Sequence, residues 1–223
     1  MLKISIFNKH INILYYLRMI KTEENFKEMS LIELTHLASR GNIGAQVSLG
    51  YRYGNGDGVK EDLGQAFSWW LEAAKQGDGT ALYNLGIMYL NGGYVEKDET
   101  AAMSWFRMSA EQGYAPAQYN LGVACQEGIV YPKDDAKAFE WYAKAAGQGL
   151  AEAQYNLGWM YEKGIGVRRD ESVAVSWYRK AADQGDWEAK NRLIELSFKH
   201  LAWTCMPKAS ISNINMKRHS SGI

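Results

Sequence analysis

The sequence predicts an all-α protein, a right-handed α-solenoid superhelix of stacked helix-turn-helix repeats of 36 residues. One observation behind this prediction is an alanine that recurs every 36 residues, five times, without an insertion. A second is a leucine four residues after each alanine, followed in the first four copies by a glycine. Self-similarity at a period of roughly 20 to 50 residues is typical of stacked-repeat proteins. The two main columns are Ala45, Ala81, Ala117, Ala153 and Ala189, and Leu49, Leu85, Leu121, Leu157 and Leu193.

The copy that begins at Ala153 is the clearest, and it predicts a pair of helices. Ala153, Leu157 and Tyr161 are four residues apart, which places them on one face of a first helix. A glycine-punctuated loop follows. Asp170 is then expected to cap the N-terminus of a second helix, and Gly185 to end it. One such hairpin cannot bury its apolar face alone, so the copies are expected to stack.

A glycine recurs inside each first helix, at Gly158 in the clearest copy. A glycine in a helix interior costs about 1 kcal/mol relative to alanine. Its recurrence predicts the close approach of a second helix, which a side chain would block. The small pair Ala181 and Ala182 is the expected neighbour of this glycine.

The chain is expected to have three parts. Residues 1–28 form an N-terminal extension, helical or disordered, residues 29–200 form the solenoid, and residues 201–223 form a disordered tail. Half-units are expected at each end of the solenoid, because terminal repeats must shield the last apolar face. The complete repeats are counted as 45–80, 81–116, 117–152 and 153–188.

The N-terminal extension contains the apolar run 11–17, which is shorter than the roughly 20 residues that a membrane-spanning helix needs. A helix that packs on the first repeat, or a disordered arm, is the main expectation. A secretory signal and a membrane-surface anchor remain alternatives, although no small-residue cleavage site follows the run. A translation start at Met19 or Met29 is a further hypothesis, because the repeat begins just after Met29.

The segments AQYNLGWMYEKGIGV and AVSWYRKAADQG resemble the Sel1-like repeat, a relative of the tetratricopeptide repeat. The resemblance covers roughly residues 30 to 196. It implies a helical solenoid that serves as an adaptor or scaffold for other proteins. It does not name the partner, because similar proteins act in assembly, secretion, quality control and host interaction. Some cysteine-rich relatives were described as β-lactamases or penicillin binders, and this resemblance therefore carries a hydrolase as an alternative.

Charge and composition argue against several other functions. Residues 30–195 carry 16 basic and 22 acidic residues, a net charge of −6, whereas nucleic-acid binding needs clustered lysine and arginine. The four histidines are scattered, so no metal site and no cofactor are predicted. Neither Ser-x-x-Lys nor Lys-Thr-Gly, the motifs of penicillin-recognising enzymes, occurs in the sequence. We therefore expect a protein that is not an enzyme.

Cys125 and Cys205 do not form the disulfide framework of the secreted, cysteine-rich relatives. Their scarcity favours a reducing compartment and hence the cytoplasm, with a periplasmic or secreted location as the alternative. Cys125 is interpreted as a small core residue. The chain is expected to be a monomer without a membrane span. A chaperone-like structural subunit of an envelope or secretion assembly is the third functional hypothesis.

The partner, a protein or peptide, is expected in a concave groove lined by the first helices. In tetratricopeptide relatives, the stripe at positions −6, −3, +1 and +4 from the in-helix glycine forms this groove. Trp159 is the preferred anchor, because it is large and stands at a variable position. The recurring residues Asn84, Asn120 and Asn156 are expected to hydrogen-bond an adjacent loop. The predicted partner-binding residues are Tyr51, Tyr83, Ile87, Leu90, Tyr119, Val123, Gln126, Tyr155, Trp159 and Glu162.

Overall fold

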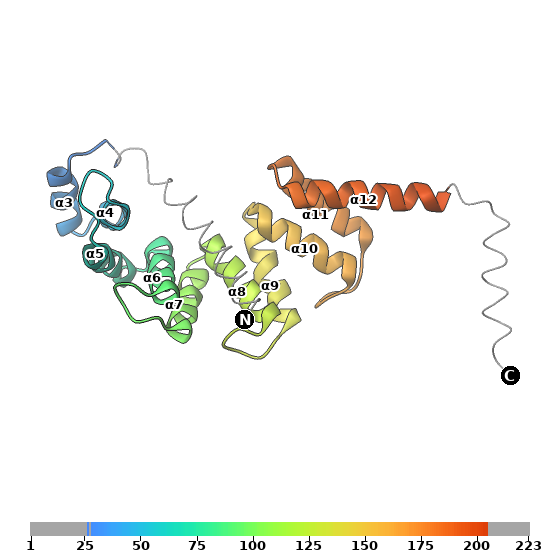
Figure 1. The fold of residues 1–223 in the computed structure, drawn as a ribbon, viewed down its shortest axis with the longest axis horizontal. Helices are drawn as coiled ribbons and strands as arrows, with labels where there is room; N and C mark the ends of the chain where they lie inside the picture. Colours follow the sequence, from blue (N-terminus) through green and yellow to red (C-terminus); the bar gives the residue numbers. More distant parts are fainter. Residues whose placement is uncertain (1–25, 27, 205–223) are drawn as a thin grey trace.

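The computed structural model describes residues 26 and 28–204, with side chains up to Lys199 (Figure 1). This part of the chain forms ten α-helices and no β-strand, so the predicted all-α solenoid is confirmed. The predictions for the N-terminal extension and the C-terminal tail concern residues that lie almost entirely outside it. The helices are α3 (Leu31–Ser39), α4 (Ile43–Asn55), α5 (Leu63–Lys75), α6 (Gly79–Asn91), α7 (Glu99–Glu111), α8 (Ala115–Glu127), α9 (Asp135–Gly147), α10 (Ala151–Lys163), α11 (Glu171–Asp183) and α12 (Trp187–Thr204).

The helices pair as four hairpins, α4 with α5, α6 with α7, α8 with α9, and α10 with α11. Figure 1 shows the hairpins side by side along an arc, with α4 and α6 toward its concave side and α5 and α7 toward its convex side. The single helices α3 and α12 stand at the two ends. The hydrophobic core is a row of clusters between adjacent hairpins, as stacking requires.

The contact between the two helices of a hairpin differs from the expected one. A Cβ atom added to Gly158 would lie 2.9 Å from ring atoms of Tyr178 and 3.1 Å from the carbonyl oxygen of Ala174. The expectation that Ala181 and Ala182 lie on this glycine is therefore wrong. Ala181 is buried in the same cluster, but the aromatic ring of Tyr178 occupies the space that the missing side chain leaves.

The same contact recurs in every hairpin, with a tryptophan, a phenylalanine or a tyrosine as the aromatic residue. The pairs are Gly50 with Trp70, Gly86 with Phe106, Gly122 with Tyr142, and Gly158 with Tyr178. All four rings are fully buried. The recurring glycine is thus explained by packing, because each one makes room for a large ring from the second helix of its own hairpin.

The predicted helix caps are confirmed. Asp170 Oδ1 accepts hydrogen bonds from the backbone N–H groups of Ser172 and Val173 at the start of α11. Asp62, Asp98 and Asp134 cap the other second helices in the same way. These side chains satisfy backbone donors that the first turn of a helix leaves unpaired.

Glutamines that recur at the C-terminal ends of the second helices form hydrogen bonds to the neighbouring hairpin. Gln148 Nε2 donates to the carbonyl oxygen of Gly113 and to Oε1 of Gln118, both at 2.8 Å. Gln184 repeats the arrangement one unit later with Gly149 and Gln154. These partners lie 30 or 35 residues apart in the sequence, so the bonds fix the register between repeats rather than the geometry within one.

Asn120 does not bond to an adjacent loop, which was the partner expected for the recurring asparagines. Asn120 Nδ2 donates to the hydroxyl oxygen of Tyr83 at 3.4 Å, and both side chains are buried. Tyr83 belongs to α6 and Asn120 to α8, the first helices of consecutive hairpins. Asn120 therefore links one first helix to the next.

Val130 is the one non-glycine residue with a positive φ in the described chain, at 64°. The equivalent loop position is Gly58 in the first repeat, with φ of 70°, and Gly166 in the fourth, with φ of 67°. A left-handed conformation is strained by roughly 1–2 kcal/mol in an L-residue and most unusual in a β-branched one. Val130 is also 40% exposed, so its side chain contributes little packing.

Replacing Val130 by glycine is therefore expected to stabilise the protein. The free energy recovered by releasing the strain is larger than the entropic cost of a more flexible unfolded chain. The free energy of unfolding should therefore rise by about 1 kcal/mol. The melting temperature should rise by roughly 2–4 °C. Circular dichroism melts of Val130→Gly and of Val130→Ala measure it. Alanine keeps the strain, so an equal gain for both variants would show that the backbone conformation is not the cause.

Candidate protein-binding surface

Three first helices contribute side chains to one cavity on the stack. The cavity has a volume of about 370 Å³ and is lined by Tyr51 of α4, Thr80 of α6, and Pro116 of α8, with Tyr114 and Gln148 beside them. Counted from the in-helix glycine of each repeat, Tyr51 stands at position +1, and Thr80 and Pro116 stand at position −6. Three positions of the predicted stripe, from three consecutive hairpins, therefore line one cavity.

Three of the predicted binding residues are core residues. Tyr83, Ile87 and Leu90 are between 1% and 3% exposed and belong to the cluster between α6, α7 and α8. Their side chains have too little accessible area to contact a partner. At these positions the stripe serves the packing of the solenoid, because α6 lies deep between its neighbours.

Tyr51 and Tyr119 are buried, and Tyr51 also lines the cavity. The ring of Tyr51 packs edge-on against Trp70, with centroids 5.7 Å apart, and Tyr119 packs against Tyr142 at the same distance. Burial raises the pKa of both phenols well above the usual value. These tyrosines are therefore neutral hydrogen-bonding groups at any physiological pH.

Gln126 and Glu162 occupy equivalent positions at the ends of α8 and α10, and both receive a tyrosine hydroxyl. Tyr142 donates to Gln126 Oε1 at 2.9 Å, and Tyr178 donates to Glu162 Oε2 at 3.0 Å. Glu162 also pairs with Arg192 of α12, whose Nε lies 2.7 Å from Oε2. The hydrogen bonds from Arg192 lower the pKa of the Glu162 carboxyl to about 2. Glu162 thus docks α12 and is not a free surface carboxylate.

Tyr155 and Trp159 remain accessible, as does Val123 of the preceding first helix. All three are half-buried. Tyr155 and Trp159 are four residues apart on α10, so they lie on one face. Burial raises the pKa of Tyr155, and the negative charge of Glu188 raises it further. The accessible part of the stripe is therefore an aromatic surface with a carboxylate beside it.

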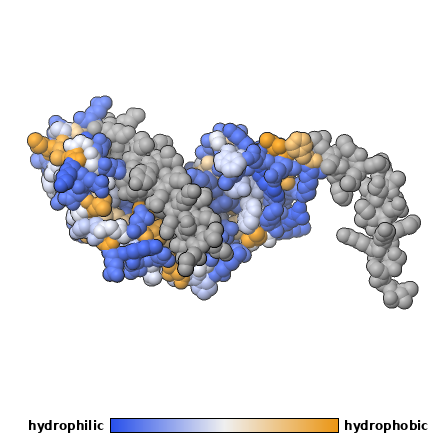
Figure 2. All heavy atoms as spheres, viewed as in Figure 1, coloured by the Kyte–Doolittle hydropathy of each residue, from blue (hydrophilic) through white to orange (hydrophobic). Residues whose placement is uncertain are grey.

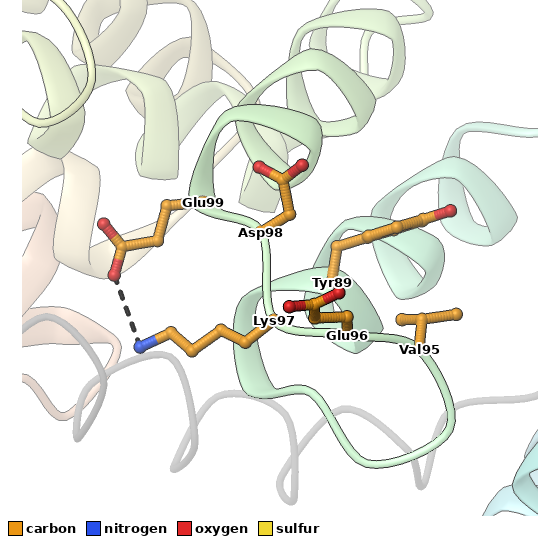
Figure 3. A pocket seen from close by; sticks show the side chains of 6 residues that line it. All are labelled: Tyr89, Val95, Glu96, Lys97, Asp98 and Glu99. Atoms are coloured by element: carbon orange, nitrogen blue, oxygen red, sulfur yellow. Dashed lines mark ion pairs between the residues drawn. The ribbon is translucent and has the colours of Figure 1, made fainter.

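A larger depression lies at the loop between α6 and α7, with a volume of about 780 Å³ (Figure 3). Its lining includes Asp98, which caps α7, and the ion pair between Lys97 Nζ and Glu99 Oε1 at 3.3 Å. Figure 3 shows Tyr89 and Val95 on the other side of the same loop. These polar groups already have structural partners, so this loop is a weaker candidate than the concave face.

The described residues contain few features typical of other kinds of site. No group of three or more histidine, cysteine, aspartate or glutamate side chains in this region could hold a metal ion. None of the helices that the structure describes has the length and apolar character needed to cross a membrane. Cys125 is partly buried against the cluster between α8 and α10, in line with its interpretation as a small packing residue.

The chain belongs to the Sel1 repeat family. The family model matches four consecutive units, residues 43–78, 79–114, 115–150 and 151–186, which together cover more than half of the chain. Each matched unit begins where a first helix begins, two residues before the units counted from the alanine column. Sel1 repeats are protein-interaction modules that form helical scaffolds.

Two solved structures are similar to this chain over most of its length. A Sel1 repeat protein from Oxalobacter formigenes shares 40% identity with a TM-score of 0.72, covering 74% of this chain and 48% of that chain. A protective antigen present in uropathogenic Escherichia coli strains, displaying an SLR fold, shares 40% identity with a TM-score of 0.70. That match covers 74% of this chain and 36% of the antigen. The chain therefore spans less than half the length of either relative. No curated protein matches it.

Proposed function

We propose that the chain is a non-enzymatic adaptor or scaffold that binds a segment of another protein along the concave side of its first helices. The observation that carries this proposal is the accessible aromatic pair, Tyr155 and Trp159, on α10. In the repeat register Trp159 and Val123 stand at the same position as Tyr51, which lines the cavity beside Pro116. Rigid aromatic side chains on a scaffold are the residues that most often anchor a partner.

The charges beside the aromatic pair indicate what the partner carries. Glu152 adds to the raised pKa of Tyr119, and Glu188 adds to that of Tyr155, so both carboxylates lie near the rings. Among the described residues neither carboxylate forms an ion pair, whereas Glu162 does. A lysine or arginine on the partner would meet opposite charge and an aromatic face together. We therefore propose a segment that combines an apolar side chain with a basic one.

Truncating Trp159 is expected to weaken partner binding. An aromatic anchor typically contributes about 2 kcal/mol or more, which corresponds to a loss of affinity of roughly 30-fold. Trp177→Ala on α11 is a matched control, because Trp177 is also a half-buried tryptophan that packs on the core, on the second helix of the same hairpin. Affinity purification from native cells identifies the partner, and titration with both variants measures the loss.

The two variants separate binding from folding. Both should lower the melting temperature by similar amounts, since both remove partly buried packing. Only Trp159→Ala should release the partner. Full binding by Trp159→Ala, or equal losses for the two variants, would overturn the assignment of the concave face.

A further inference from the structure

Helix α12 occupies the place of the first helix of a fifth repeat, with one change in the glycine column. Ala189 and Leu193 stand in the recurring alanine and leucine columns, but Ile194 stands in the glycine column. Ala189 and Leu196 pack on Tyr178 and Ala174 of α11. In the four hairpins the glycine makes room for a ring of the second helix. At the equivalent position of α12 the side chain of Ile194 takes the place of this glycine.

The face of α12 that points away from α11 is apolar. Trp187 is 67% exposed, Ile194 52% and Phe198 65%. Their spacings of seven and four residues place them in one narrow stripe along the helix. Figure 1 shows α12 projecting beyond α11, and Figure 2 shows hydrophobic residues gathered on the surface of this projection. Isolated exposed apolar residues are ordinary, but an aligned stripe on a projecting helix marks an interaction surface.

The stripe has the pattern of a two-stranded coiled-coil seam. With Trp187 and Ile194 at d positions, Asn191 and Phe198 fall at a positions. A single asparagine at an a position is the residue that sets parallel register in two-stranded coiled coils. Asn191 is exposed, so its amide is available for this contact.

The charges that flank the stripe are complementary to those of an identical helix in parallel orientation. Lys190 stands at a g position and Glu195 at the e position five residues later, on opposite sides of the seam, and both are exposed. In a parallel pair, g of one helix meets the following e of the other, so each Lys190 would meet Glu195 of the other copy. In an antiparallel pair the flank that carries Glu188 and Glu195 would face itself, and like charges would repel.

We propose that a second copy of this chain covers this face, through a parallel pairing of the two α12 helices about a two-fold axis. A self-complementary patch of this kind closes into a dimer and does not propagate. The seam is only about two and a half heptads long, so the dimer should form in a concentration-dependent manner. The sequence led us to expect a monomer, and this proposal departs from that expectation.

Sedimentation velocity of the full chain from about 1 µM to about 1 mM tests the dimer. The wild-type protein should shift from monomer to dimer across this range. Ile194→Glu places a charge in the centre of the seam and should remain monomeric throughout. The matched control is Ile32→Glu, because Ile32 of α3 is 83% exposed at the opposite end of the solenoid, and this variant should dimerise like the wild type.

Two further variants test the orientation. Lys190→Glu and Glu195→Lys should each dimerise more weakly alone, and an equimolar mixture should form mixed dimers. Glu195 also pairs with Arg192, so circular dichroism confirms that the second variant is folded. Asn191→Cys, in a chain carrying Cys125→Ser and Cys205→Ser, should form a disulfide dimer on mild oxidation, because parallel a positions lie opposite each other.

Three results would overturn the proposal. They are a wild-type protein that stays monomeric at about 1 mM, an Ile194→Glu variant that dimerises like the wild type, and an Asn191→Cys variant that does not cross-link at concentrations where the dimer is present. The first is also the result expected if residues 205–223 of the same chain cover the stripe.

Discussion

The variant Gly122→Ala is expected to lower the free energy of unfolding by about 2 kcal/mol. An added Cβ would lie 2.6 Å from two ring carbons of Tyr142, which is only 1% exposed and therefore has little room to move. Overpacking of this kind costs about 1–3 kcal/mol, and it more than offsets the gain of up to about 1 kcal/mol that alanine brings to a helix. Urea denaturation of the wild type and the variant measures the difference.

Gly147→Ala is the matched control for this prediction. Gly147 also lies within a helix, at the end of α9, but a Cβ added there meets no atom within 4 Å. This variant should raise the free energy of unfolding by about 0.5–1 kcal/mol, through helix propensity and a less flexible unfolded chain. If both variants stabilise the protein, the glycine–aromatic contact does not constrain the hairpin.

The variant Arg192→Ala is expected to destabilise the protein by about 2–3 kcal/mol near neutral pH. It removes the less exposed of the two cations that pair with Glu162, whose side chain is 6% exposed, and leaves this carboxylate with the more exposed Lys163 and the hydroxyl of Tyr178. Breaking a fully buried pair costs about 3–5 kcal/mol, and the 28% exposure of Arg192 lowers that figure. The last helix, α12, should lose its attachment first, which hydrogen exchange of its amides would show.

The same ion pair predicts a pH dependence with a definite sign. The folded-state pKa of Glu162 is about 2, below the ordinary value of 4.5, so the ionised carboxylate stabilises the folded state. This contribution is complete above the ordinary pKa and is lost as the pH falls from about 5 to about 2. The stability difference between the wild type and Arg192→Ala should therefore shrink over that range.

Glu162→Gln provides the control for the pH dependence. Gln126 shows that an amide at this position accepts the hydrogen bond of the facing tyrosine. The glutamine variant should retain the hydroxyl contact and lose the acid-dependent step. An unchanged acid-dependent loss of stability in Glu162→Gln would mean that another carboxylate is responsible.

Much of the fold could be predicted from the sequence, because it depends on local signals that recur. The alanine and leucine columns define the buried face of each first helix, and aspartates such as Asp170 mark where the second helices begin. The recurring glycine predicted a close helix contact, but it could not say which residue fills the space. Tyr178 and Ala181 lie on the same helix three residues apart, and only the three-dimensional packing shows which of them lies on Gly158.

The candidate binding surface could be predicted only in part. Helical spacing places the stripe on one side of the first helices, and the cavity around Tyr51, Thr80 and Pro116 agrees with it. Helical spacing does not indicate how deeply a residue is buried. The sequence therefore could not show that Ile87 is buried whereas Trp159, at the same repeat position two units later, is partly accessible. The glutamine column at Gln148 and Gln184 was visible in the sequence at the 36-residue period, but its role required the contacts between neighbouring hairpins.

Site-specific photo-crosslinking in native cells tests most directly whether the concave face is the binding surface. A photoreactive phenylalanine analogue at Tyr155 should cross-link the partner, because this half-buried ring lies beside Trp159 on the proposed surface. The same analogue at Trp177, on the second helix of the same hairpin, should not. The proposed function predicts a cross-linked product from Tyr155 alone, and a product from Trp177 without one from Tyr155 would contradict it.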